Sequence, residues 1–126
     1  MTFQKIFLLV GTAGAALAVV LGAFGAHGLK GSLSEALLNA YQTGVQYQFY
    51  HSLALLLVAI LLRQGLEGTW ILVSGALFIA GLLFFSGSLY ALALGGPRWL
   101  GPITPLGGLM FIAAWCSLFI AVLRNS

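Results

Sequence analysis

Charged side chains are scarce in this chain, at 6% of residues, and only two of them are acidic. All of them lie at or beyond the ends of the apolar stretches; they are Lys5, Lys30, Glu35, Arg63, Glu67, Arg98 and Arg124. A nucleic-acid-binding surface needs a clustered basic face, so this pattern argues against one. No carboxylate falls inside an apolar stretch, where proton-translocating proteins normally carry one.

A single cysteine, Cys116, excludes an intrachain disulfide, and we expect it to pack as a small apolar residue. Catalytic groups are equally few. His51 is the one plausible base for Ser86 or Ser88, and no carboxylate is placed to orient it, as a hydrolytic triad requires. We therefore expect the protein not to be an enzyme.

Hydrophobic residues, in contrast, make up 61% of the chain. They form four stretches, near residues 6–26, 45–63, 70–94 and 103–123. A helix needs about 20 mostly apolar residues to cross a hydrocarbon core. The sequence therefore predicts one integral membrane domain over residues 1–126, surrounded by membrane lipids.

The first stretch follows Lys5 and ends near Ala23 and Gly25, a pattern also typical of a signal peptide. Its small residues repeat at helical spacing, which a discarded peptide would not need. We expect it to be retained as the first span.

The connections between the stretches are short, so neighbouring spans should be antiparallel. Residues 31–44 show helical periodicity, and Ser32 and Glu35 have the spacing of a capping box. This segment predicts a short amphipathic helix on the membrane surface, or an extension of the second span bent at Gly44. The expected fold is an all-α, antiparallel four-transmembrane-helix bundle with this short amphipathic helix between spans one and two.

The distribution of basic residues predicts how the protein is oriented in the membrane. Lys5, Arg63 and Arg124 would lie on one side of the membrane, and Lys30 and Arg98 on the other. The positive-inside rule then places both termini in the cytoplasm.

Small residues repeat every fourth position in the first span, at Gly14, Ala18, Gly22 and Ala26. Such a stripe lets two helix backbones approach closely in lipid. The stripe predicts a close contact either with another helix of the same chain or with a second copy of the protein in a dimer. A four-helix bundle already requires close contacts between its own helices, so we favour the contact within the chain. Gly107 and Gly108 near the start of the fourth span predict a second close approach.

Alternating spans also bring most polar side chains to one half of the bundle. The predicted cluster consists of His27, Gln46, Tyr47, Gln48, His51, Ser86, Ser88, Tyr90 and Thr104. Polar residues inside a bilayer usually face the bundle interior or a water-filled cavity. Two interpretations remain open: a hydrogen-bonded knot that holds the helices in register, and a pocket lined by Gln48, His51, Ser86 and Tyr90.

His27 and His51 raise the question of a bound haem or metal ion, since two imidazoles on facing helices can hold a haem iron. No further cysteine or carboxylate accompanies them in the spans, and a histidine at this depth more often bonds a neighbouring carbonyl or hydroxyl group. We expect no cofactor and no metal site.

The chain contains four distinctive motifs: Gly22-Ala-Phe-Gly-Ala-His27, Thr43-Gly-Val-Gln-Tyr47-Gln-Phe-Tyr-His51, Phe85-Ser-Gly-Ser-Leu-Tyr90 and Thr104-Pro-Leu-Gly-Gly108. Together they resemble the YgdD-like family, small four-span proteins of bacterial inner membranes that have unknown function and mitochondrial relatives. The resemblance runs through all four spans. It implies the fold and the membrane location, and it supplies no activity, substrate or catalytic residue.

Two functional hypotheses follow. The first is a non-enzymatic accessory, assembly or scaffold protein that acts through helix–helix contacts with another membrane protein or with a second copy of itself. The second is a lipid- or small-solute-binding or transport protein that uses a polar half-cavity around His51.

Overall fold

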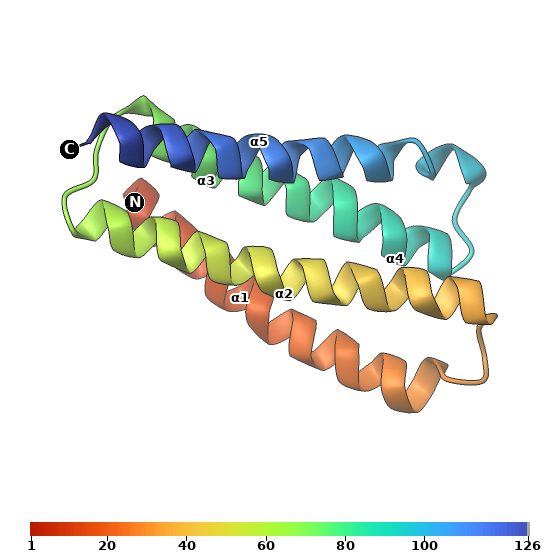
Figure 1. The fold of residues 1–126 in the computed structure, drawn as a ribbon. Helices are drawn as coiled ribbons and strands as arrows, with labels where there is room; N and C mark the ends of the chain where they lie inside the picture. The colour runs from red at the N-terminus through yellow and green to blue at the C-terminus, as the bar shows by residue number, and fades with distance from the viewer. Residues whose placement is uncertain (126) are drawn as a thin grey trace.

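The computed structural model describes residues 1–125, which form helices joined by short connections (Figure 1). The first span is α1 (Phe3–Phe24), continued by the π-helical turn η1 (Gly25–Leu29). The second is α2 (Glu35–Arg63). These two spans form a helical hairpin, because α1 packs along α2.

The third span is built from three consecutive pieces, α3 (Thr69–Gly81), the π-helical turn η2 (Leu82–Ser86) and α4 (Gly87–Ala93). The 3₁₀ turn η3 (Arg98–Leu100) and α5 (Ile103–Arg124) complete the chain. Four helical segments within residues 1–125 are thus long and apolar enough to cross a membrane. This confirms the predicted all-α, four-span fold.

The segment from residue 35 to residue 44 is the beginning of α2 and not a separate amphipathic helix. The 29 residues of α2 extend for about 44 Å at 1.5 Å per residue, whereas a hydrocarbon core is about 30 Å thick. The first turns of α2 therefore reach beyond the hydrocarbon. The helix also continues without interruption through Gly44, where the sequence had suggested a bend.

The capping prediction at the start of α2 was wrong by two residues. Ser34 is the N-cap, and its side-chain oxygen accepts a hydrogen bond of 3.2 Å from the Leu37 amide. Glu35 is already the first helical residue. Ser32 lies in the preceding turn, where its amide donates to the Leu29 carbonyl at 2.9 Å, so it has no role in a capping box.

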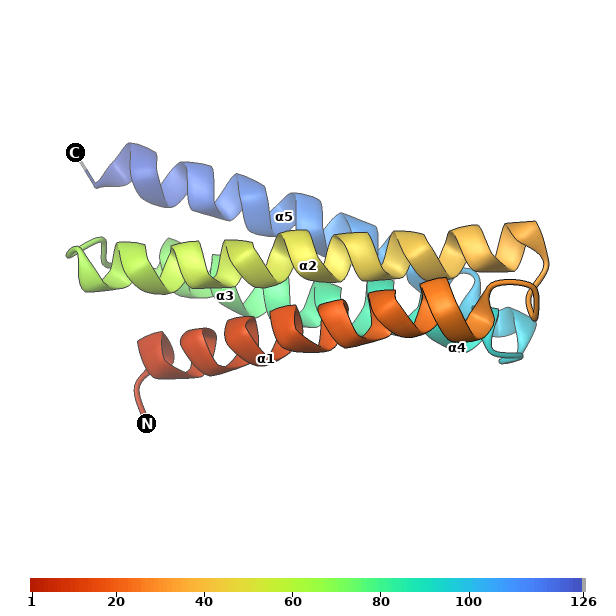
Figure 2. The same ribbon diagram turned by 90° about the horizontal axis from the view of Figure 1, so that it is seen from below.

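The helices do not form a closed ring. α2 packs against α1 on one side and against α3, η2 and α4 on the other, while α5 packs against α3, η2 and α4. Figures 1 and 2 show α1 and α5 on opposite sides of the molecule in two perpendicular views. The inner helices are therefore α2 and the α3–α4 segment, and the outer helices are α1 and α5.

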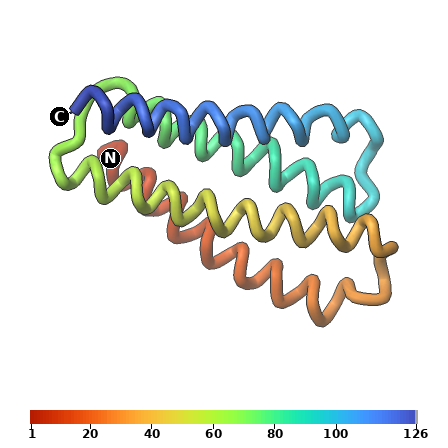
Figure 3. Tube along the Cα trace, in the orientation of Figure 1, coloured from red at the N-terminus to blue at the C-terminus, as the bar shows by residue number. Residues whose placement is uncertain are grey.

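The core lies where the inner helices meet, around the fully buried side chains Leu55, Val58, Ile71 and Phe78. The chain trace in Figure 3 shows both termini at one end, together with the α2–α3 connection. The α1–α2 and α4–α5 connections lie at the other end. We call this second end the polar end.

Candidate functional site

Gln48 lies in the half of α2 nearer the polar end and links three helices. Its side-chain amide donates to the Gly14 carbonyl of α1 at 2.8 Å, and its carbonyl oxygen accepts from the Tyr90 hydroxyl of α4 at 2.6 Å. Gln48 is buried, with 8% of its surface exposed. A buried amide is stable in hydrocarbon when it finds such partners. This pair of bonds therefore ties α2 to both α1 and α4.

Two further hydroxyl groups bond to backbone carbonyls across helices. Ser86 of η2 donates to Gly44 of α2 at 2.8 Å, and Tyr41 of α2 donates to Leu21 of α1 at 2.6 Å. The absence of a side chain at Gly44 lets the Tyr90 ring lie against α2, because a Cβ at Gly44 would come within 2.8 Å of that ring. Gly44 thus permits close packing where a bend had been considered.

Ser88 and Thr104 connect α4 to α5. Their hydroxyl oxygens are 2.5 Å apart, and Ser88 also lies 3.0 Å from the Phe85 carbonyl. Ser88 has one proton, so when it donates to this carbonyl it accepts from Thr104. The polar residues of the third span thus bond both to α2 and to α5.

His51 occupies a different environment, among aromatic rings. Its Nδ1 lies 2.8 Å from the Tyr47 carbonyl, and the Trp115 indole N–H donates to its Nε2 at 3.2 Å. A carbonyl only accepts and an indole N–H only donates, so these partners assign the neutral ring with its proton on Nδ1. The ring also stacks on Phe111, with centroids 3.7 Å apart and planes inclined by 8°.

Both nitrogens of His51 are therefore engaged with protein groups. His27, in η1, is exposed and lies in a different span. Within residues 1–125, no three His, Cys, Asp or Glu side chains come together as metal ligands would. The arrangement of His51 suits a structural bond better than ligation.

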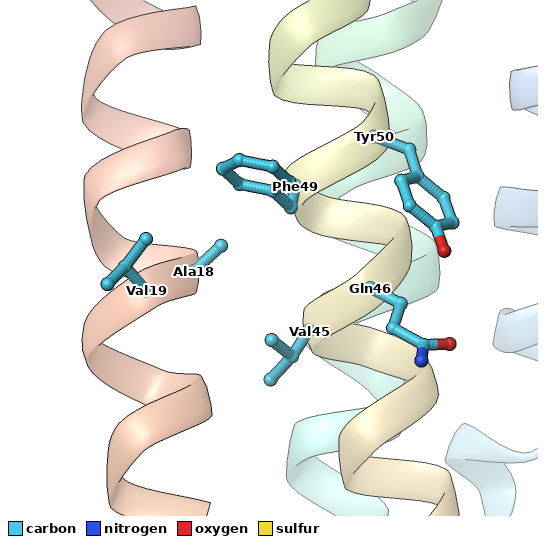
Figure 4. A pocket seen from close by; sticks show the side chains of 6 residues that line it. All are labelled: Ala18, Val19, Val45, Gln46, Phe49 and Tyr50. Carbon is cyan, nitrogen blue, oxygen red and sulfur yellow. The ribbon is translucent and has the colours of Figure 1, made fainter.

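Some residues of the predicted cluster do not join it. His27 and Gln46 are exposed, and Tyr47 is at the surface beside the buried His51. Figure 4 shows Gln46 directed away from α1, on the face of α2 that also carries Tyr50. An open hollow between α1 and α2 is lined by these two side chains and by apolar ones, and none of the buried polar side chains line it.

The structure also corrects the prediction of a single pocket. Gln48, Ser86 and Tyr90 line a groove between α1 and α4, with a volume of about 420 Å³. His51 lines another groove, between α2 and α5, of about 600 Å³. The reason is that η2 packs against α2 and separates the two grooves. Ser86 of η2 lines the groove between α1 and α4, whereas Phe85 lines the groove between α2 and α5.

We call these the α1/α4 groove and the α2/α5 groove. Sequence reasoning missed Tyr41, Phe111 and Trp115, which bond to or stack on the polar residues. The spacing of Phe111 and Trp115, four residues apart on one helix face, was a usable signal for the aromatic cluster.

The small-residue face of α1 packs against α2 within the chain. A Cβ added to Gly14 would overlap the Ser52 side-chain oxygen, and one added to Gly22 would come within 3.3 Å of Val45. Ala18 is buried in the same face. Ala26, by contrast, is exposed, and Gly25 takes its place against the Tyr41 ring. A helix turns every 3.6 residues, so an exact four-residue repeat drifts off the contact face.

Ser52 carries the one buried side-chain N or O atom in residues 1–125 that lacks a hydrogen-bond partner. Since a Cβ at Gly14 would overlap this oxygen, the Cα–H of Gly14 points toward it. Contacts of this weak Cα–H···O type recur at helix–helix interfaces.

The two glycines at the start of α5 differ in their surroundings. A Cβ at Gly107 would overlap the backbone of Phe84 and Phe85, whereas one at Gly108 would lie at an ordinary 3.7 Å from the Phe85 ring. Gly107 is thus the residue that lets α5 lie on the backbone of η2. Gly108 instead leaves open space, and it lines the α2/α5 groove.

Comparison with known proteins gives consistent matches. The family described as "Protein of unknown function (DUF423)" matches residues 21–108. The UPF0382 membrane protein YwdK of Bacillus subtilis is 46% identical over 122 residues, covering 96% of this chain and 98% of that protein. A UPF0382 membrane protein of Staphylococcus aureus is 43% identical over the same shares of both chains.

A third relative, a UPF0382 membrane protein of Staphylococcus saprophyticus, is 42% identical over 96% of this chain and 99% of its own. No solved structure matches the chain. These similarities extend over nearly the whole length of each protein and agree with the resemblance noted in the sequence. The chain belongs to the DUF423 family of small membrane proteins of unknown function.

Proposed function

We propose that the protein is a non-enzymatic accessory, assembly or scaffold protein that acts through contacts made within the membrane. The observation that carries this proposal is that the buried polar side chains are engaged in hydrogen bonds within the protein itself. Gln48, His51, Ser86 and Ser88 each bond to a protein group in the same chain. Their chemistry serves to hold the helices together.

The outer helices provide the surface for such contacts. Along α1, Leu17 and Val20 are more than half exposed, and along α5 so are Ile112 and Phe119. α1 is packed mainly against α2, and α5 mainly against the third span, which leaves the far side of each free to meet another helix. The partner in this proposal is another membrane protein or a second copy of the chain.

Photo-crosslinking tests this proposal. A photoreactive amino acid is placed at Val20 or Phe119, which are 62% and 69% exposed, and at Ile71, which is fully buried, as a control. We expect a protein adduct, visible as a shifted band on a gel, from at least one exposed position and none from Ile71. Lipid adducts alone, together with a monomer in mild detergent, would overturn the proposal.

A second candidate function is lipid or small-solute binding, and the α1/α4 groove favours it. The groove gathers three of the four side chains that the sequence placed in one pocket, and its walls are apolar. Gly87 lines it, and a Cβ added at this glycine would meet no other atom within 4 Å. We expect native mass spectrometry to find a lipid retained by the wild-type protein and lost from Gly87→Leu. Equal retention by both proteins would count against this candidate.

For location, we propose the inner membrane of a bacterial cell, with both termini in the cytoplasm. Support comes from the bacterial relatives and from the charges. Lys5 lies in the first turn of α1, and Arg63 and Arg124 end α2 and α5, all at the end that carries the termini. Lys30 and Arg98 lie in the two connections at the polar end.

A further inference from the structure

The α2/α5 groove has a composition unlike that of a surface that only meets acyl chains. Its walls carry the exposed rings of Tyr47 and Trp115, which are 38% and 44% exposed. Between them lie the stacked and buried rings of His51 and Phe111. Gly108 keeps one side of the groove open, because it presents no side chain. The groove thus offers flat aromatic surfaces to a ligand.

The groove also has one unused hydrogen-bond donor. The Trp115 N–H donates to His51, and the His51 N–H is directed at the Tyr47 carbonyl, so both are engaged. The Tyr47 hydroxyl has no hydrogen-bond partner among residues 1–125, although its ring lines the groove. A ligand that supplied an acceptor at this point would satisfy the hydroxyl group.

We propose that the α2/α5 groove binds a planar, lipid-soluble ring that bears a carbonyl acceptor, which is the chemistry of a quinone. The quinone ring lies in the groove against the exposed rings of Tyr47 and Trp115, and a ring carbonyl accepts from the Tyr47 hydroxyl. Aromatic faces favour offset or edge-on contact with another ring. A volume of about 600 Å³ falls within the range typical of small-molecule sites, roughly 300–1,000 Å³. Quinone binding in this groove is a property additional to the proposed accessory, assembly or scaffold role, and it does not depend on that role.

Trp115 provides a built-in reporter for the test. The chain has three tryptophans, and the double variant Trp70→Phe/Trp99→Phe keeps Trp115 alone. A short-chain benzoquinone is added to the purified protein in detergent, and tryptophan fluorescence is recorded. We expect saturable quenching, because the quinone stacks within contact of the indole. The variant Trp70→Phe/Trp115→Phe, which keeps Trp99 in η3, should show only the linear quenching of a quinone dissolved in the micelle.

Two glycine variants then locate the site. Gly108→Leu fills the α2/α5 groove and should abolish saturation, whereas Gly87→Leu fills the α1/α4 groove and should leave it unchanged. Tyr47→Phe keeps the ring and removes the hydroxyl, and it should weaken apparent affinity about fivefold, as expected for one hydrogen bond. If Gly108→Leu does not elute as a folded protein, the affinity of Tyr47→Phe for the quinone still tests the proposal.

The proposal is overturned if Trp115 and Trp99 are quenched alike and without saturation. It also fails if Tyr47→Phe binds as tightly as the parent, or if a saturated fatty alcohol competes as well as the quinone does. In that last case the groove would be a site for any acyl chain.

Discussion

At Gly14 the backbone of α1 rests on the Ser52 side chain of α2, with no room for a Cβ. We predict that Gly14→Ala lowers the free energy of unfolding by about 1–3 kcal/mol, the usual range for overpacking a close contact. Adding Ser52→Ala should restore part of this loss, because it removes the oxygen that the new methyl group would overlap. Thermal unfolding in detergent, followed by circular dichroism, would measure both changes.

Gly87→Ala is the matched control for this prediction, since it also adds one methyl group to a helical glycine but meets no atom within 4 Å. It should leave stability unchanged or raise it slightly. If Gly14→Ala unfolds at the same temperature as Gly87→Ala, the described contact between α1 and α2 is wrong.

Gln48 supports a second prediction, because one side chain bonds to two other helices. Gln48→Ala leaves the Gly14 carbonyl and the Tyr90 hydroxyl without their partner. Interhelical hydrogen bonds in membranes average about 0.6 kcal/mol each, so we predict a loss of about 1–2 kcal/mol. Gln46→Ala, two residues away and exposed, should change stability by less than about 0.5 kcal/mol. Equal losses in unfolding experiments would contradict a bridging role.

Between elements, the contact of α5 with the π-helical turn η2 depends on Gly107. We predict that Gly107→Ala severely destabilises the protein, by about 2 kcal/mol or more, because the new methyl group would overlap main-chain atoms that cannot rotate away. Gly108→Ala should be tolerated, since its methyl group would sit at van der Waals distance from Phe85. The yield of folded monomer on size exclusion, with unfolding temperature, would separate the two variants, and similar behaviour would argue against this packing.

The spans themselves could be predicted from sequence, because the cost of exposing backbone groups in lipid forces long apolar stretches into helices. Their antiparallel order followed from the short connections. The sequence could not decide whether residues 35–44 form a separate helix or the beginning of α2, since they are polar enough for a separate surface helix. Their helical hydrogen bonds simply continue into the span.

The candidate site was predictable in part. Alternating spans bring Gln48, Ser86 and Tyr90 together around one groove. The position of His51 in another groove depends on how η2 packs against α2, and sequence spacing carries no information about that. Nor did the sequence indicate a π-helical turn at 82–86, which sends Phe85 and Ser86 to different sides. Such turns occur often at functional sites.

On the scale of the whole molecule, the protein consists of two helical hairpins that meet through α2 and the third span. Its four spans return the C-terminus to the side where the chain began, as Figure 3 shows. We expect the distribution of basic residues, three at the end with the termini against two at the polar end, to set the orientation in the membrane.

We predict that the wild-type protein places both termini in the cytoplasm, and that Lys5→Gln/Arg63→Gln inverts a substantial fraction of the molecules. These changes leave Arg124 at the terminal end against Lys30 and Arg98 at the polar end, which reverses the bias that sets topology. A C-terminal alkaline phosphatase fusion, active only outside the cytoplasm, reports the orientation. Glu35→Gln/Glu67→Gln is the control and should change nothing, because acidic residues contribute little to this bias. A wild-type fusion that is already fully active would place the C-terminus outside the cytoplasm and would contradict the predicted orientation.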